Sequence, residues 1–185
     1  PAYAAGLRTT LRLDRATPSA TFAPLVSDDG GEHTTHFSII DAEGNRVAVT
    51  QTINGWFGSS FAVPGLDLLL NNEMDDFAVK PGEPNLYQLV GATANNIEPG
   101  KRMLSSMTPT FLESPRGVSI LGTPGGSRII SMVLLAALAW ADGADAATMA
   151  ALPRYHHQYL PDRLVYEEGA LSTAELEELG RRGHR

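Results

Sequence analysis

Residues 34–52, TTHFSIIDAEGNRVAVTQT, decide the fold that the sequence predicts. Side chains alternate with a period of two over residues 34–41 and again over residues 46–52, which is typical of half-buried β-strands. Between the two runs, residues 43–45 read EGN, which is a turn signal. The stretch therefore predicts a β-hairpin whose first strand begins at Thr34.

Two long irregular segments are expected on the C-terminal side of this hairpin. Residues 55–65 are rich in glycine and serine, and residues 80–100 are rich in proline, glycine and asparagine, so both are expected to be loops. A loop as long as the second is more often a lid or a binding loop than a neutral connection. The other expected elements are strands at 103–112, 117–121 and 164–166 and helices at 128–140, 144–151 and 172–182, the last with a capping box at Ser172 and Glu175.

The composition is that of a globular domain, and it excludes several classes of protein. The chain has 185 residues, 43% of them hydrophobic, and a formal net charge of -7. Because binding to nucleic acid requires a basic face, this acidic balance argues against nucleic acid as a partner. No apolar run reaches the roughly 18 residues that span a bilayer. Cysteine is absent, which excludes disulfides, thiolate catalysis and cysteine-based metal sites.

Thr34 and Thr35 stand where a small, polar and acidic stretch, residues 27–32, meets the predicted strand. Threonine is a good strand former, so strand propensity alone can explain the pair. Alternatively, the chain is cut before Thr34, and one residue then owns both a hydroxyl and a free α-amine. Because such an amine has a pKa of ~7.7–8.0, it can serve as the base that activates its own hydroxyl.

An acidic cluster, Glu73, Asp75 and Asp76, follows two asparagines at 71–72. Such a cluster is usually solvated, or it binds a hard cation through oxygen ligands. The calcium-loop pattern is absent here, which weakens the cation interpretation. A third interpretation is that one or two of these carboxylates recognise a positively charged ligand group, such as an ammonium.

Three polar motifs in the C-terminal half have simple structural explanations. Ser105 and Ser106 form a hydroxyl pair near the edge of a predicted strand. Gly125 and Gly126 precede a helix, where they form either a tight turn or backbone donors for an anion or an oxyanion. No Lys-Ser or Lys-Thr follows them, so they are not a nucleotide-binding phosphate loop. Residues 156–157 are both histidine, but adjacent residues point in different directions, so we interpret the pair as structural.

Several motifs, taken in order, are similar to the small subunit of the gamma-glutamyltranspeptidase family. They are T-T-H-F-S-I-I-D at 34–41, L-L-N-N-E-M-D-D-F at 69–77, K-P-G-x-P-N-x-Y at 80–87, K-R-x-L-S-S-M at 101–107 and G-x-P-G-G-S-R-I at 122–129. The resemblance covers essentially the whole chain. Residues 1–33 resemble the end of the family's large subunit, and residues 34–185 resemble its small-subunit catalytic domain.

The resemblance implies an N-terminal nucleophile hydrolase, an α+β fold with a four-layer αββα sandwich, of which this chain supplies the small-subunit part. It implies autoproteolysis between His33 and Thr34. It further implies hydrolysis or transfer of γ-glutamyl groups, from glutathione and similar amides to water, an amino acid or a dipeptide, through a threonyl acyl-enzyme. No cofactor or metal is implied. The large subunit of the same precursor is the implied partner, and the implied location is periplasmic or extracellular.

The resemblance also assigns catalytic roles to four positions. Thr34 corresponds to the nucleophile, and Thr52 corresponds to a residue beside it that assists it. The backbone amides of Gly125 and Gly126 correspond to the oxyanion hole, which agrees with their position before a helix.

Six further positions correspond to substrate-binding residues of the family. The α-amino end of the γ-glutamyl group would be held by Asn54, Glu73 and Asp76, and its α-carboxylate by Ser105 and Ser106. Tyr87 corresponds to a lid-loop tyrosine that reaches the asparagine. These roles suit the chemistry, because glutamate is a zwitterion at its α-carbon and needs carboxylates at one end and donors at the other.

Two alternatives to a γ-glutamyl enzyme remain open. One is a related acylase of the same superfamily; the pair Glu73 and Asp76 argues against it, because a glutaryl group has no α-ammonium to bind. The other is a non-catalytic fragment in which Thr34 is still linked to His33, and intact mass distinguishes it from a processed protein. In the family an arginine of the large subunit also binds the α-carboxylate, so we expect the isolated chain to be inactive.

Overall fold

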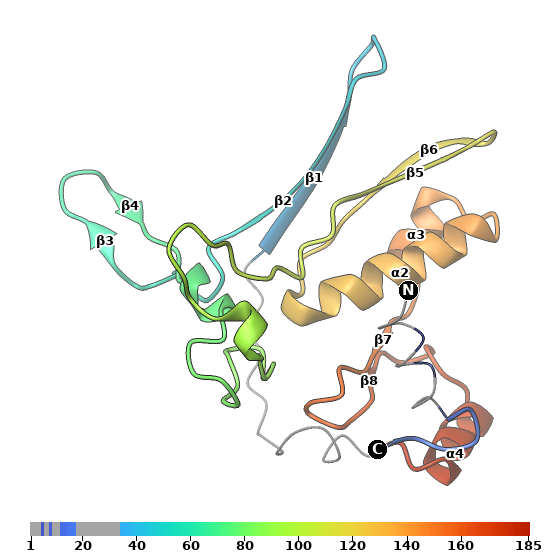
Figure 1. The fold of residues 1–185 in the computed structure, drawn as a ribbon. Helices are drawn as coiled ribbons and strands as arrows, with labels where there is room; N and C mark the ends of the chain where they lie inside the picture. The colour runs from blue at the N-terminus through green and yellow to red at the C-terminus, as the bar shows by residue number, and fades with distance from the viewer. Residues whose placement is uncertain (1–4, 6–7, 9–11, 18–33) are drawn as a thin grey trace.

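The computed structural model describes residues 5, 8, 12–17 and 34–185. The expected connector at 27–32 and the expected cleavage point before Thr34 lie outside these residues. Strands β1 (Thr34–Ile40) and β2 (Arg46–Thr52) pair antiparallel, with Thr34 opposite Thr52 (Figure 1). The predicted hairpin is therefore confirmed, including its first residue.

The turn of this hairpin is organised by the side chain of Asp41. Its Oδ1 atom accepts hydrogen bonds from the backbone amides of Glu43 at 3.0 Å and Asn45 at 2.8 Å. Gly44 has a φ of 85°, a conformation that glycine adopts without strain. The Asp41 side chain thus accepts two backbone amides at the point where the chain reverses, which stabilises the turn.

Residues 80–100 are mostly irregular, as the sequence predicted. Only a 3-10 turn, η3 (Thr93–Asn95), and an isolated bridge between Pro84 and Val90 occur there.

The expectation of a loop throughout 55–65 was wrong at its end. There β3 (Ala62–Val63) pairs with β4 (Leu68–Leu69). Gly65, with a φ of 81°, lies in the connection that reverses the chain between these strands.

The second large hairpin is formed by β5 (Thr110–Ser114) and β6 (Gly117–Leu121). The sequence predicted a first strand from 103, and this was wrong for residues 103–109. The polar groups there bond to loops instead of to a neighbouring strand: the amide of Leu104 donates to Asn95, and the hydroxyl of Ser106 donates to the carbonyl of Gly126. A strand without such a partner does not form.

The C-terminal third contains the helices that the sequence predicted. These are α2 (Ile129–Ala141), α3 (Ala146–Ala151) and α4 (Thr173–Arg181). Both hydrogen bonds of the capping box between Ser172 and Glu175 are present at the start of α4. Two short strands, β7 (Tyr155–His156) and β8 (Val165–Tyr166), pair between α3 and α4. No helix in the described part of the chain has the length and apolar character that a bilayer span requires.

The two long hairpins, β1–β2 and β5–β6, are stacked with helix α2. Hairpin β5–β6 lies between hairpin β1–β2 and helix α2 in Figure 1. An ion pair between Arg46 of β2 and Glu113 of β5 joins the two hairpins. The guanidinium of Arg116, in the turn of β5–β6, lies 4.8 Å from the ring centroid of Trp140 at the end of α2. The order is thus sheet, sheet, helix, in an α+β arrangement.

The apolar core of the described residues is small. Its buried members are Phe77, Ala78, Ile129, Val133 and Leu160. Many larger apolar side chains are exposed instead, among them Phe37, Ile39 and Ile40 on β1, Phe111 on β5 and Leu134 and Leu138 on α2. The strands form four separate two-stranded sheets, so their outer edges are unpaired among the described residues. Such edges and faces are suited to contact with further polypeptide.

Candidate active site

The candidate nucleophile lies at the first position of β1. Thr34 is half-buried and directly opposite Thr52 of β2. Because directly opposed residues of an antiparallel pair point to the same face, with Cβ atoms about 4.5–5.5 Å apart, the two hydroxyl side chains are neighbours. The hydroxyl oxygen of Thr52 accepts a hydrogen bond from the amide of Asn54 at 2.9 Å. This bond connects β2 to the loop that carries the next predicted site residue.

His36 follows on the same face of β1 and contacts the loop before α2. Its Nδ1 atom lies 2.8 Å from the hydroxyl oxygen of Thr50 on the opposite strand. The ring lies against Gly122, where an added Cβ would be 2.0 Å from Nδ1. Burial lowers the pKa of His36, which favours the neutral ring. Sequence reasoning assigned His36 no role, although its two-residue spacing from Thr34 placed it on the face of the nucleophile.

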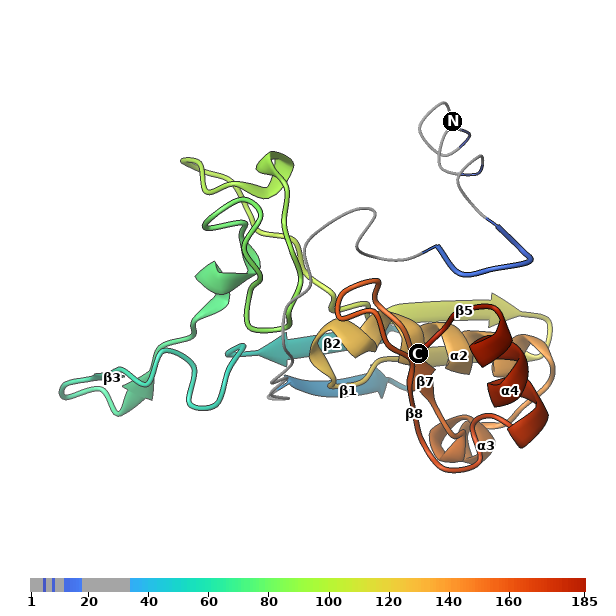
Figure 2. The ribbon, with the colours of Figure 1, turned by 90° about the horizontal axis from the view of Figure 1, so that it is seen from below.

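Gly125 and Gly126 form a strained turn that only glycine fits. Their φ angles are 139° and 54°, and both residues are buried. A Cβ on Gly125 would lie 2.2 Å from the terminal methyl of Met132, and one on Gly126 would lie 2.3 Å from the ring of Tyr87. The turn leads into α2, whose start lies beside the start of β1 in both views (Figures 1 and 2). Backbone amides at such a turn are suited to bind an oxyanion.

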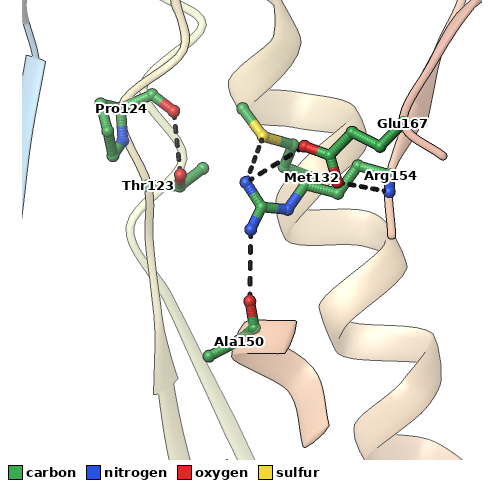
Figure 3. A network of polar contacts seen from close by, with 6 residues as sticks. All are labelled: Thr123, Pro124, Met132, Ala150, Arg154 and Glu167. Atoms are coloured by element: carbon green, nitrogen blue, oxygen red, sulfur yellow. Dashed lines mark hydrogen bonds and ion pairs between the residues drawn. The ribbon is translucent and has the colours of Figure 1, made fainter. Parts of the chain in front are cut away.

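Arg154 supports the side chain on which this turn rests (Figure 3). Its guanidinium lies 3.8 Å from the sulfur of Met132 and donates to the carbonyl of Ala150 at 3.2 Å. The carboxylate of Glu167 accepts a hydrogen bond from the Arg154 backbone amide at 3.0 Å and lies 3.8 Å from the guanidinium nitrogen that contacts the sulfur. The side chain of Met132, which belongs to α2, thereby lies against a guanidinium that is also bonded to α3, and its methyl contacts Gly125.

The acidic cluster forms a 3-10 turn, η2 (Glu73–Asp76). Burial, with a smaller contribution from the charge of Asp76, raises the pKa of Glu73 to about 7. Burial, with a smaller contribution from Asp75, raises the pKa of Asp76 to about 6. The Oε1 atom of Glu73 is buried without a hydrogen-bond partner among the described residues. Two desolvated carboxylates of this kind favour a cationic ligand group, which would compensate their charge.

Asp75 differs from its two neighbours, because its carboxylate has a structural partner. Its Oδ2 atom accepts a hydrogen bond from the amide of Leu86 at 2.8 Å. This bond attaches the loop that carries Tyr87 to the acidic turn. Within the described residues, no group of three or more histidine and acidic side chains is arranged as metal ligands.

Asn95 connects the acidic turn to the serine pair, and sequence reasoning missed it. It is only 9% exposed. Its amide nitrogen donates to the carbonyl of Asp76 at 2.7 Å, and its amide oxygen accepts from the amide of Leu104, beside Ser105, at 3.1 Å. The separation between the two ends of the candidate pocket therefore depends on one buried side chain. No motif spacing marks Asn95 within its proline- and glycine-rich loop.

The two serines occupy different environments. Ser106 donates its hydroxyl proton to the carbonyl of Gly126 at 2.8 Å, which ties this segment to the glycine turn. Ser105 is exposed, and its hydroxyl oxygen accepts from the amide of Met107 at 3.2 Å. The proton of Ser105 can therefore be offered to a ligand, whereas that of Ser106 is already used.

Tyr87 covers the glycine turn and reaches Asn54. Its hydroxyl donates to the backbone carbonyl of Asn54 at 3.3 Å. Asn54 is 2% exposed with a φ of 71°, and its side-chain nitrogen donates to the carbonyl of Asn72 at 3.3 Å. In this structure the Asn54 side chain thus supports the loops, and its role as a substrate ligand stays a prediction.

A cavity of about 360 Å³ brings four predicted site residues together. Its lining includes Asp76, Tyr87, Ser105 and Ser106. Among the described residues, the lining does not include the other predicted site residues Thr34, Thr52, Asn54, Glu73, Gly125 and Gly126. Carboxylate and hydroxyl groups therefore line one cavity, while the candidate nucleophile, Thr34, lies at the start of β1.

Comparison with known proteins places this arrangement in a family. The sequence matches the family model for gamma-glutamyltranspeptidase over residues 1–185. The chain belongs to the gamma-glutamyltranspeptidase family. It is 44% identical over 172 residues to a glutathione hydrolase proenzyme from Pseudomonas sp. (strain A14), a match that covers 92% of this chain and 30% of that protein.

Other members of the family are similar to this chain to the same degree. A glutathione hydrolase proenzyme from Escherichia coli (strain K12) is 43% identical over 171 residues, with 91% of this chain and 30% of that protein covered. The solved structure of a gamma-glutamyltranspeptidase mutant from Helicobacter pylori is 45% identical, with a TM-score of 0.77 and 82% of each chain covered. The α+β fold of the N-terminal nucleophile hydrolases is thereby confirmed. The chain spans about 30% of the length of these curated relatives.

Proposed function

We propose that this chain supplies the nucleophile and most of the γ-glutamyl pocket of an enzyme that hydrolyses or transfers γ-glutamyl groups. The observation that carries the proposal is the cavity with a desolvated carboxylate, Asp76, and an available hydroxyl, Ser105, in its lining. An amino acid α-carbon carries an ammonium and a carboxylate, so its recognition requires both kinds of group. Relatives named glutathione hydrolase proenzyme support the same substrate class.

The nucleophile in this proposal is generated by cleavage of the peptide bond between His33 and Thr34. Cleavage converts the amide nitrogen of Thr34 into a primary amine, and the ordinary pKa of such an α-amine, ~7.7–8.0, allows it to accept a proton near neutral pH. The hydroxyl oxygen of Thr34 then attacks the γ-carbonyl carbon of the substrate, and its proton passes to the amine. Thr52, opposite Thr34 on the same face, is placed to orient the hydroxyl.

Two acyl transfers complete the reaction. As the tetrahedral intermediate forms, the amides of Gly125 and Gly126 stabilise its oxyanion. The bond between the γ-carbonyl carbon and the leaving nitrogen breaks, and the leaving amine takes the proton from the Thr34 amine. The resulting ester is attacked by water, an amino acid or a dipeptide, which releases glutamate or a new γ-glutamyl amide and restores the threonine hydroxyl.

Substrate binding in this proposal uses the two ends of the pocket. Glu73 and Asp76, with Asn54, hold the α-ammonium, and the burial that raises the pKa values of both carboxyls favours a cationic partner there. Ser105 donates its available proton to the α-carboxylate, and Ser106 joins it when its hydroxyl turns away from the carbonyl of Gly126. Hydroxyls are weak partners for a carboxylate, so a charged donor from the large subunit of the same precursor is part of the proposal. The exposed apolar faces of β1 and β5 are surfaces suited to that subunit.

The decisive experiment is release of a chromophoric amine from a γ-glutamyl anilide by the protein expressed in full, with N-terminal sequencing of the processed chain. We expect turnover and a new N-terminus at Thr34. The Thr34→Ala variant is expected to show neither cleavage nor turnover. Faster release from a glutaryl anilide, which lacks the α-ammonium, would favour the related acylase instead. Fractionation of producing cells tests the periplasmic or extracellular location that we propose for the enzyme.

A further inference from the structure

The side-chain amide of Gln158 lies at the junction of three segments that are distant in sequence. Gln158 follows β7 and is half-buried. Its amide nitrogen donates to the carbonyl of Tyr87 at 2.9 Å and to the carbonyl of Leu160 at 2.8 Å. Its amide oxygen accepts from the hydroxyl of Ser127 and lies 2.8 Å from Nε2 of His156. Both donors and both acceptor positions of this amide are therefore used.

The partners determine which way the amide points. Two of them are backbone carbonyls, which only accept, so the nitrogen of Gln158 must face Tyr87 and Leu160. The oxygen must then face donors, which requires a proton on Nε2 of His156. The Nδ1 atom of that ring is left to accept from the hydroxyl of Ser131 on α2, at 2.7 Å. Every donor thus meets an acceptor along the chain of hydrogen bonds that runs from Ser131 on α2 through His156 and Gln158 to the loop at Tyr87.

Two of these partners belong to the proposed active site. The ring of Tyr87 covers Gly126, and its hydroxyl reaches the carbonyl of Asn54. Ser127 is the next residue after Gly126, so its hydroxyl ties the glycine turn to the same amide. One side chain thus bonds the lid loop through its nitrogen and the glycine turn through its oxygen.

We propose that Gln158 is a positioning residue that holds the Tyr87 loop closed over the Gly125–Gly126 turn. This inference rests on the proposed function for its kinetic consequences, but the clamp itself is a property of the fold. The donor half of the amide keeps Tyr87 against Asn54 and so preserves the substrate pocket. The acceptor half keeps Ser127, and with it the oxyanion turn, in place.

The two halves can be separated by substitution. Gln158→Glu retains the shape and the acceptor oxygen but removes both amide donors, and with them the hydrogen bonds to the carbonyls of Tyr87 and Leu160. In the full protein we expect the KM for a γ-glutamyl anilide to rise about tenfold with kcat within about twofold. We also expect hydrogen exchange of residues 85–90 to accelerate about tenfold, because the hydrogen-bonded turn at Asn85 loses its anchor.

Ser127→Ala removes only the bond from the glycine turn. We expect its kcat to fall about fivefold with KM and exchange of residues 85–90 unchanged, because only the oxyanion turn is loosened. The matched control is Gln51→Glu, the same chemical change on an exposed residue of β2, with no expected change in any of these quantities. A loss of stability alone would lower the active fraction, and therefore kcat, without raising KM.

The inference is overturned if Gln158→Glu leaves both KM and exchange of residues 85–90 within about twofold of the wild type. If Gln158→Glu does not fold, an unchanged kcat in Ser127→Ala overturns it instead. Absence of anilide cleavage by the wild-type protein would refute the proposed function. The exchange comparison would still decide whether Gln158 holds the loop.

Discussion

Replacing Glu73 by glutamine is expected to stabilise the protein and to weaken substrate binding at the same time. Burial raises the pKa of this carboxyl from an ordinary 4.5 to about 7, so the folded state disfavours its charged form. The associated stability is fully present below the unfolded pKa of 4.5 and is lost as the pH rises through about 7. At pH 8 the wild-type protein therefore carries a cost that glutamine does not.

The size of this cost follows from the difference between the two pKa values. That difference corresponds to at most about 3 kcal/mol, and screening of a half-buried group by solvent reduces it to about 1 kcal/mol. We expect Glu73→Gln to raise the free energy of unfolding at pH 8 by about this amount. At pH 4 the carboxyl is mostly protonated in both states, and we expect almost no difference.

The same carboxyl should affect substrate binding in the opposite way, because its charged form costs stability but binds the substrate. A carboxyl with a pKa of about 7 is about 10% ionised at pH 6 and about 90% at pH 8, and the α-ammonium binds the ionised form. Through Glu73 alone, the wild-type KM for a γ-glutamyl anilide should therefore fall about tenfold over this interval, and the further twofold from Asp76 makes the expected total about twentyfold. Glu73→Gln should have a high KM at both pH values, with about a twofold dependence left from Asp76.

Urea unfolding at pH 4 and pH 8, together with KM measured at pH 6 and pH 8, tests both expectations. Glu168→Gln, a change of the same kind on an exposed residue, is the matched control and should alter neither quantity. A Glu73→Gln protein that is less stable than the wild type at pH 8 would refute the argument from desolvation. A variant that keeps the tenfold dependence of KM would refute the role of Glu73 in binding.

Three further substitutions probe the supports of the site. Gly122→Ala places a methyl against the ring of His36, and overpacking of this kind should cost about 1–3 kcal/mol and lower kcat, measured by thermal unfolding and anilide release. Asn95→Ala removes two buried hydrogen bonds and should cost about 2–4 kcal/mol and raise KM, whereas equal stability in urea would contradict its role as a link. Ser172→Ala breaks the capping box of α4 and should cost about 1 kcal/mol without altering turnover; a changed kcat would show that α4 influences the site.

Local patterns in the sequence were sufficient for the elements that depend on near neighbours. The alternation of residues 34–41 and 46–52 predicted the β1–β2 hairpin, because side chains of a strand point alternately to two faces. Ser172 and Glu175 predicted the start of α4, because both hydrogen bonds of a capping box are formed within one turn. The motifs around Thr34 and Gly126 were also sufficient to predict the family.

Contacts between distant segments could not be predicted in this way. Residues 103–109 were predicted to be part of a strand, yet their polar groups bond to Asn95 and Gly126, and the strand begins only at Thr110. Gln158 lies 71 residues from Tyr87 in sequence, and no spacing rule relates the two. The same holds for the pKa of Glu73, because desolvation depends on what the rest of the chain places around the carboxyl. Sequence by itself determined which chemical groups are present and which strand carries the candidate nucleophile. The tertiary structure decided which of those groups share a cavity, since only folding brings segments that are far apart along the chain within hydrogen-bonding distance.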